Sequence, residues 1–188
     1  MARIIGISGG IGSGKSYISS ILREKGYTVY DTDSEAKRLI VNEPSIRKAV
    51  EDLLGTDVFD GDSYLTQKVA ERVFCQPTLL AQLNAIVHPA VSKDILSKAA
   101  MRDGILFVES AILFPSHLDA ICYKTVWVTA PEEVRIERVI ARDNTTKAHV
   151  HGRLKAQKEE SAKADLVIIN DGEQPVSVLV EQILSLIS

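Results

Sequence analysis

The sequence predicts an α/β fold in which a five-stranded parallel sheet is flanked by helices. Two observations predict it. Short, continuously apolar runs recur along the chain, and most are followed by a segment whose apolar residues have helical spacing. Strands that alternate with helices in this way build a parallel sheet with helices on both faces. The five apolar runs lie at 3–8, 27–30, 104–108, 123–128 and 166–169.

Composition narrows the class of protein. The chain has 188 residues, of which 45% are hydrophobic and 25% charged, an ordinary balance for one globular domain. Its formal net charge of −3 disfavours a dedicated nucleic-acid-binding protein. No apolar run approaches the ~20 residues of a membrane span, and no secretory signal precedes the first strand. We therefore expect a cytoplasmic protein without membrane partners, in which Cys75 and Cys122 are reduced core residues.

The chain begins with a β-α-β unit and continues into an insertion. A strand at 3–8 and a helix that stops at Gly26 lead into the second strand at 27–30. From there to about residue 102 the spacing is helical, without strand alternation. Helix breaks are expected near 42–45, 55–63, 76–77 and 88–89, with Pro89 as the first residue of a new helix.

After the insertion the alternation of strands and helices resumes. The strands at 104–108 and 123–128 precede a helix that starts near Pro131, where the first turn tolerates proline. A basic, helix-prone stretch then covers about 143–160. The fifth strand leads into a closing helix whose apolar residues stripe one face: Val176, Leu179, Val180, Ile183 and Ile187.

The glycine-rich segment after the first strand carries the clearest chemical signal. It matches GxxxxGK[ST] between a predicted strand and a predicted helix, the context of a P-loop. Its glycines let successive N–H groups face phosphate oxygens, Lys15 can reach the β- and γ-phosphates, and the Ser16 hydroxyl can ligate Mg²⁺. The segment predicts a P-loop NTPase fold that binds a nucleoside triphosphate with Mg²⁺. The expected nucleotide ligands are Gly10, Ile11, Gly12, Ser13, Gly14, Lys15 and Ser16.

A P-loop occurs in kinases, in nucleotide-dependent switches and in motors, so other residues must separate these classes. The Asn-Lys-x-Asp tetrapeptide of common guanine-nucleotide switches does not occur here. A kinase needs a base for its acceptor, and Asp31-Thr32-Asp33 closes the second strand, where parallel sheets place ligands. If 31–33 stays extended, both carboxylates point to one side. The alternative is that Asp33 caps a helix that starts at Ser34.

Cationic side chains gather after the fourth strand. Arg135, Arg138 and Arg142 form one helical stripe, which is either a solvated face or a set of phosphate ligands. Residues 135–158 hold seven Lys and Arg residues against two acids, a net charge of +5. Glu109, just past the third strand, either holds Mg²⁺ through water or is a solvated acid. His149 and His151 are expected to be surface residues, because no third metal ligand accompanies them.

Taken together, these segments resemble the dephospho-coenzyme A kinase family over the whole length. The resemblance rests on IIGISGGIGSGKS at 4–16, Asp31-Thr32-Asp33, VF at 73–74, LNAIVHP at 83–89, RVIARD at 138–143 and ADLVIINDG at 164–172. The family commonly has aspartate where this chain has Glu109.

The resemblance implies an activity and assigns residues to it. The implied enzyme is a phosphotransferase that moves the ATP γ-phosphate to the ribose 3′-hydroxyl of dephospho-coenzyme A, the last step of coenzyme A biosynthesis. Lys15, Asp33 as the base and Arg142 as a lid arginine are then catalytic. Asn170 and Gly172 join the ATP site, and Asp33, His88 and Arg138 contact the acceptor. Other kinases of small metabolites or nucleosides, and a nucleotide-dependent binding switch, remain as alternatives.

The same resemblance divides the chain into functional parts. The expected core comprises 1–32, 103–142 and 161–188. The helical insertion at about 33–102 binds the acceptor, and the segment at about 143–160 is the lid over the phosphates. The positive charge of the chain is thus concentrated where two phosphate-bearing substrates would meet.

Overall fold

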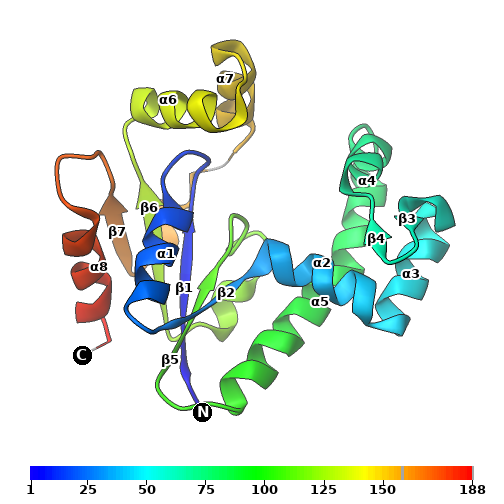
Figure 1. Ribbon diagram of the computed structural model, residues 1–188, viewed down its shortest axis with the longest axis horizontal. Helices are drawn as coiled ribbons and strands as arrows, with labels where there is room; N and C mark the ends of the chain where they lie inside the picture. Colours follow the sequence, from blue (N-terminus) through cyan, green and yellow to red (C-terminus); the bar gives the residue numbers. More distant parts are fainter. Residues whose placement is uncertain (158, 188) are drawn as a thin grey trace. The chain divides into compact units, whose positions relative to one another are not determined.

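The computed structural model describes residues 1–157 and 159–187 and contains a five-stranded parallel sheet (Figure 1). The strand order is β2-β5-β1-β6-β7, and β1 pairs in parallel with both β5 and β6. The fold class expected from the alternating apolar runs is thereby confirmed. The strands are β1 Arg3–Gly9, β2 Thr28–Asp31, β5 Ile105–Glu109, β6 Lys124–Thr129 and β7 Leu166–Ile169.

Two helices from opposite ends of the chain cover one face of this sheet. Helix α1 (Lys15–Glu24) and helix α8 (Val176–Ser185) contribute apolar side chains to the same core as the alternate residues of β1 and β6. Completely buried members of this core include Ile5, Ile7, Ile18, Leu22, Val126, Val128, Val180 and Ile183. The burial of these side chains fixes the end of β1 and the start of α1, between which the glycine-rich segment lies.

The chain divides into two units, Met1–Tyr30 with Ala99–Ser188, and Asp31–Lys98. The second unit has its own core, formed by Ile40, Val50, Leu54, Val58, Phe59, Val69 and Leu83. Its helices are α2 Thr32–Asn42, α3 Pro44–Leu54, α4 Thr66–Val73 and most of α5 Pro77–Ala100, with the 3-10 helix η1 at Thr56–Val58.

One feature of the second unit was not expected from the helical spacing. Strands β3 (Phe59–Asp60) and β4 (Ser63–Tyr64) pair antiparallel around a two-residue turn. Gly61 in this turn has a φ of 57°, a conformation that glycine adopts readily. The insertion is therefore not helical throughout, because the Gly61-Asp62 turn directs a short hairpin that apolar periodicity does not reveal.

The expected helix break at His88-Pro89 is wrong. Helix α5 runs for 24 residues with Pro89 inside it. Pro89 lacks the N–H that would bond to the carbonyl of Ala85, which weakens the helix at this point. Buried side chains lie on both sides of the proline, Leu83 before it and Val91 and Ile95 after it, and their packing keeps the helix continuous.

Helices α6 (Glu132–Asp143) and α7 (Lys147–Ala156) lie beyond the carboxyl ends of β1 and β6 (Figure 1). Thr146 caps α7, since its hydroxyl accepts from the N–H of His149. A small apolar cluster joins the two helices through buried Ile136, Val139 and Val150. Helix α7 falls within the expected lid, whereas Lys158 lies outside the described residues. The first unit also contains two 3-10 helices, η2 at Leu118–Ile121 and η3 at Ser161–Lys163.

The cysteines differ from their expected setting. Both are free, but Cys75 is exposed and therefore not a core residue. Cys122 is half-buried, and this burial raises the pKa of its thiol to about 12, so it stays protonated at neutral pH. Across the described part of the chain, no helix has the length and apolar character that crossing a membrane requires.

Candidate active site

The glycine-rich segment forms a tight loop between β1 and α1. Gly12 and Gly14 have φ values of 75° and 91°, and Gly14 is the residue that precedes the first turn of α1. This loop directs backbone N–H groups and the positive end of α1 toward one space, as anion binding requires. The Lys15 ammonium folds back and donates to the carbonyls of Gly9 and Gly10, at 2.6 and 3.1 Å.

Ser16 and Glu109 meet at the carboxyl end of β1. The register pairs Ile7 of β1 with Glu109 of β5, and the Ser16 hydroxyl donates to Glu109 Oε1 at 2.7 Å. Glu109 is only 7% exposed, and among the described residues no partner hydrogen-bonds its buried Oε2. A hydroxyl oxygen beside a carboxylate oxygen that lacks a partner is a donor set suited to Mg²⁺. These two residues therefore fit the expected cation.

Asn170 and Arg138 brace the other side of the loop. Asn170 follows β7, and its Nδ2 donates to the Ser13 carbonyl at 2.9 Å. Arg138 Nη1 donates in turn to the Asn170 carbonyl at 2.9 Å. A Cβ on Gly14 would lie 2.2 Å from Asn170 Nδ2, and its φ of 91° would strain any larger residue at this position. The expected contacts of Asn170 with adenine and of Arg138 with the acceptor stay predictions, as does that of exposed Gly172.

Two side chains that contact the loop were not assigned to it from the sequence. Arg135 Nε donates to the Ile11 carbonyl at 2.9 Å, and Gln157 Oε1 accepts from the Ile11 N–H at 2.8 Å. Arg135 belonged to the cationic stripe, but nothing in the sequence singles out a glutamine at the end of a basic helix. Both line a cavity of about 250 Å³ with Gly10, Trp127, Glu132, His151, Leu154, Lys155 and Glu159.

Arg142 contacts its neighbour in the sequence. Its guanidinium binds both carboxylate oxygens of Asp143, at 2.6 and 3.0 Å, and its side chain is 62% exposed. Arg153 Nη1 approaches the same carboxylate at 3.1 Å. The hydrogen bond from Arg142 is the main reason that the pKa of Asp143 falls to about 2. The predicted contact of Arg142 with phosphates would require it to leave Asp143.

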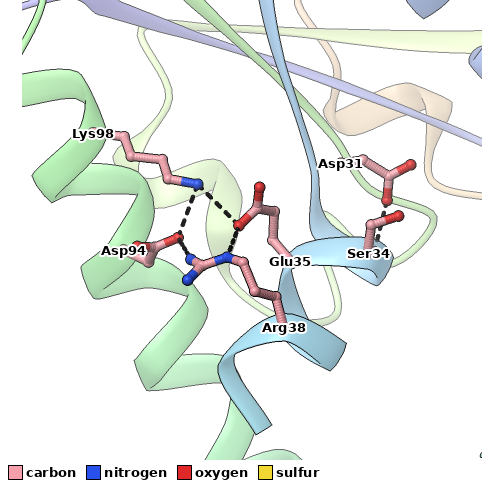
Figure 2. Close-up of polar contacts among 6 residues, drawn as sticks. All are labelled: Asp31, Ser34, Glu35, Arg38, Asp94 and Lys98. Carbon is pink, nitrogen blue, oxygen red and sulfur yellow. Dashed lines mark hydrogen bonds and ion pairs between the residues drawn. The ribbon is translucent and has the colours of Figure 1, made fainter. Parts of the chain in front are cut away.

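The Asp31-Thr32-Asp33 segment differs from both expected conformations. It does not stay extended, and Asp33 is not the cap. Helix α2 starts at Thr32, and one carboxylate oxygen of Asp31 accepts from the N–H groups of Asp33 and Ser34. Figure 2 shows the contact with Ser34. An aspartate that precedes the first helical turn caps it well, because it satisfies otherwise unpaired N–H groups. Asp33 is thus an exposed residue in the first turn of α2.

Two carboxylates and two cations connect α2 to α5 in the second unit (Figure 2). Arg38 donates to Glu35 at 2.6 Å and to Asp94 at 2.9 Å, while Lys98 contacts the same two acids at 2.9 and 3.4 Å. This closed set of ion pairs restrains α2, which carries Asp33, against α5. His88 is a half-buried residue of α5, and its expected contact with the acceptor stays a prediction.

His149 and His151 lie at or near the surface, as expected. His149 is exposed, and His151 Nδ1 lies 3.2 Å from Glu132 Oε1. Within 1–157 and 159–187, no group of three His, Cys, Asp or Glu side chains is arranged to hold a metal ion.

Comparison with known proteins identifies the family. The family model described as dephospho-CoA kinase matches residues 3–175. A dephospho-CoA kinase of Bacteroides fragilis is 40% identical over 197 residues, which cover 100% of this chain and 93% of the relative. A Thermus thermophilus protein, TT1252, superposes with a TM-score of 0.84 at 31% identity, covering 100% of this chain and 98% of that one.

A more distant solved structure agrees in fold. The dephospho-CoA kinase from Campylobacter jejuni has a TM-score of 0.66 at 20% identity, with 100% of this chain and 96% of that chain covered. Because the family model and the B. fragilis relative both extend over nearly the whole chain, the likeness includes the insertion as well as the phosphate loop. The chain belongs to the dephospho-CoA kinase family.

Proposed function

We propose that the chain performs its family's reaction, transfer of the ATP γ-phosphoryl group to the 3′-hydroxyl of dephospho-coenzyme A. The observation that supports it most is the phosphate loop with Ser16 hydrogen-bonded to buried Glu109, in a chain that matches the family from residue 3 to residue 175. The proposal includes a cytoplasmic location and ATP and dephospho-coenzyme A as the substrates, which complete coenzyme A synthesis.

The phosphate loop holds the triphosphate in this proposal. Backbone N–H groups between Gly10 and Ser16, other than that of Ile11, which donates to Gln157 Oε1, provide hydrogen bonds to phosphate oxygens, and α1 adds the positive end of its dipole. The Lys15 ammonium exchanges its two backbone carbonyl partners, Gly9 and Gly10, for β- and γ-phosphate oxygens. The Arg142 guanidinium likewise leaves the Asp143 carboxylate and binds the γ-phosphoryl group that is transferred. Both cations then stabilise negative charge that develops on that group.

Asp33 is the proposed base. Its carboxylate accepts the proton of the 3′-hydroxyl while the hydroxyl oxygen bonds to the γ-phosphorus and the bond from that phosphorus to the β,γ-bridging oxygen breaks. ADP carries away the electrons of the broken bond. His88 and Arg138 complete the proposed acceptor contacts.

Ser16 and Glu109 are the residues that would hold Mg²⁺, the hydroxyl directly and the carboxylate through water. The cation, when bound with ATP, neutralises charge between the β- and γ-phosphates. The chain itself supplies orientation, exclusion of water and the proton acceptor.

An assay with competing acceptors tests the proposal. The protein is mixed with ATP, Mg²⁺ and one acceptor: dephospho-coenzyme A, AMP, shikimate or gluconate. The formation of ADP is measured, and the products are identified by mass spectrometry. We expect ADP and a 3′-phosphorylated product only with dephospho-coenzyme A. ADP formation with another acceptor alone would assign a different kinase. The absence of acceptor-dependent ADP, together with nucleotide-controlled binding of a partner, would indicate a switch.

A further inference from the structure

We propose that Arg135 and Gln157 are positioning residues that hold the phosphate loop at Ile11 and thereby fasten α6 and the end of α7 to the nucleotide site. This inference rests on the proposed role of the loop in ATP binding. It concerns two side chains that contact the backbone of the loop at a residue whose own side chain also packs against α6 and α7. Three sets of contacts support it.

The first set uses both backbone groups of Ile11. Its N–H donates to Gln157 Oε1 at 2.8 Å, and its carbonyl accepts from Arg135 Nε at 2.9 Å. The two side chains also approach each other, with Arg135 Nη2 3.5 Å from Gln157 Oε1. A loop residue whose N–H and C=O are both engaged cannot rotate without breaking a hydrogen bond, so the orientation of its backbone is set from outside the loop.

The second set involves the Ile11 side chain. It packs against the apolar cluster of α6 and α7, whose buried members are Ile136, Val139 and Val150. Ile140 and Leu154 pack against the same cluster. Ile11 is therefore held by apolar contact as well as by its two hydrogen bonds, and movement of either helix would be transmitted to the loop.

The third set is the close approach of Arg135 to the glycines on either side of Ile11. A Cβ on Gly10 would lie 2.1 Å from Arg135 Nη2, and a Cβ on Gly12 would lie 2.5 Å from the Arg135 carbonyl oxygen. The second clash is with backbone, which cannot move aside cheaply. The absence of side chains at these two positions therefore serves the docking of α6 as well as the approach of phosphate.

Docking at Ile11 also determines where the other arginines of α6 lie. Arg138 and Arg142 follow Arg135 by about one and two helical turns on the same side of the helix. When Arg135 is fixed to the loop, the distance from the loop to Arg142 is set by a rigid helix. Loss of the contacts at Ile11 should weaken ATP binding first, because the loop and the lid helix then move independently.

Substitutions at Gln157 separate this role from a general effect on folding. Gln157 only accepts hydrogen bonds at Ile11, so Gln157→Glu retains the acceptor while Gln157→Leu removes it at similar size. We expect Gln157→Leu to raise the Kd for ATP with Mg²⁺ about tenfold by calorimetry. The KM for ATP should rise with it, while the KM for the acceptor should change little.

Hydrogen exchange provides a readout that needs neither ATP nor activity. In the nucleotide-free protein the Ile11 amide should exchange slowly, and peptides that cover residues 9–14 should exchange faster in Gln157→Leu than in Gln157→Glu. Gln182→Leu, the same change on the exposed surface of α8, is the matched control and should leave both readouts unchanged.

Several outcomes would overturn the inference. Unchanged ATP affinity and exchange in Gln157→Leu would do so, and so would equally fast exchange in nucleotide-free Gln157→Leu and Gln157→Glu, since the lost amide donor would then be responsible. If Gln157→Leu does not fold, Arg135→Lys and Gln157→Asn are judged by the same measurements. If the unaltered protein does not phosphorylate dephospho-coenzyme A, the proposed function fails, while exchange at Ile11 still decides this inference.

Discussion

Asp31 and the proposed base Asp33 differ in their settings although they stand two residues apart. The Asp31 carboxylate is engaged by the N–H groups of Asp33 and Ser34, so it stabilises the start of α2. Asp33 lies one residue inside the helix and is exposed. A capped helix start holds the Asp33 backbone in one conformation, which suits a base that must meet a hydroxyl at a defined position.

Replacing Asp33 with asparagine tests its role as the base. We expect Asp33→Asn to bind ATP with an affinity within about twofold of the original and to lose about 100-fold or more in kcat, because the amide cannot accept the proton. Steady-state kinetics and calorimetry give the two values. Asp62→Asn, at a side chain that is 99% exposed in the second unit, is the control. Unchanged turnover in Asp33→Asn would leave Asp33 with only a structural part in the first turn.

Glu109 is the residue with which the proposed magnesium site can be tested. Glu109→Gln keeps an oxygen that can accept from Ser16 but loses the negative charge, so the Mg²⁺ concentration for half-maximal activity should rise about tenfold. Stability without Mg²⁺ should not fall, since a buried carboxylate oxygen without a partner among the described residues is removed. The control is Glu133→Gln on the exposed side of α6. An unaltered Mg²⁺ dependence would contradict this role.

At the scale of elements, the attachment of α2 to α5 depends on charge and therefore on pH. Burial alone raises the pKa of Glu35, but the hydrogen bonds from Lys98 and Arg38 outweigh it and lower the pKa below its ordinary value of 4.5. A carboxylate with a lowered pKa in the folded state stabilises the protein above its ordinary pKa. That contribution is lost as the pH falls through the lower, folded-state value.

Glu35→Gln should consequently have an effect that depends on pH. We expect it to lower the free energy of unfolding by about 0.5–1 kcal/mol at pH 7 and by progressively less below about pH 4.5, as Glu35 becomes protonated in the original protein. Urea unfolding at several pH values measures the difference. Asp52→Asn, which breaks the more exposed pair with Lys48 on α3, should change stability less. An effect of Glu35→Gln that does not vary with pH would contradict the assignment.

Replacing the proline inside α5 should stabilise the protein, whereas Glu35→Gln should destabilise it. Pro89→Ala restores an N–H that can bond to the Ala85 carbonyl, so the free energy of unfolding should rise by about 1 kcal/mol after allowance for the more flexible unfolded chain. Pro77→Ala is the control, because Pro77 stands at the first residue of the same helix, where proline costs little. Denaturant titration of both variants provides the comparison. A destabilised Pro89→Ala would show that the ring makes packing contacts worth more than the missing bond.

For the molecule as a whole, the sequence predicted most where local patterns repeat. Apolar runs predicted all five strands of the sheet, and the glycine spacing placed the loop between β1 and α1. The proximity of Ser16 and Glu109 could be anticipated, since Glu109 ends β5 and the loop to Ser16 begins at the carboxyl end of the neighbouring strand β1.

What the sequence did not predict depends on contacts between distant residues or on competition between local signals. Gln157 and Ile11 are 146 positions apart, and no periodicity links them. In Asp31-Thr32-Asp33 either aspartate could cap the following helix. Asp31 is the cap because β2 ends there and the helix begins at the next residue. Pro89 resembles a helix break locally, whereas buried neighbours on both sides keep α5 continuous.

The indole of Trp127 gives the molecule an optical signal of its own. It is the only tryptophan in the chain, it is 2% exposed, and it lines the same cavity as Gly10, Arg135 and Gln157. Its fluorescence should therefore change in a saturable way as ATP and Mg²⁺ are added, and Trp127→Phe should abolish the signal. Emission that stays constant while calorimetry records binding would show that this cavity does not respond to nucleotide. If the signal is present, occupancy of the phosphate loop can be followed in real time without a label.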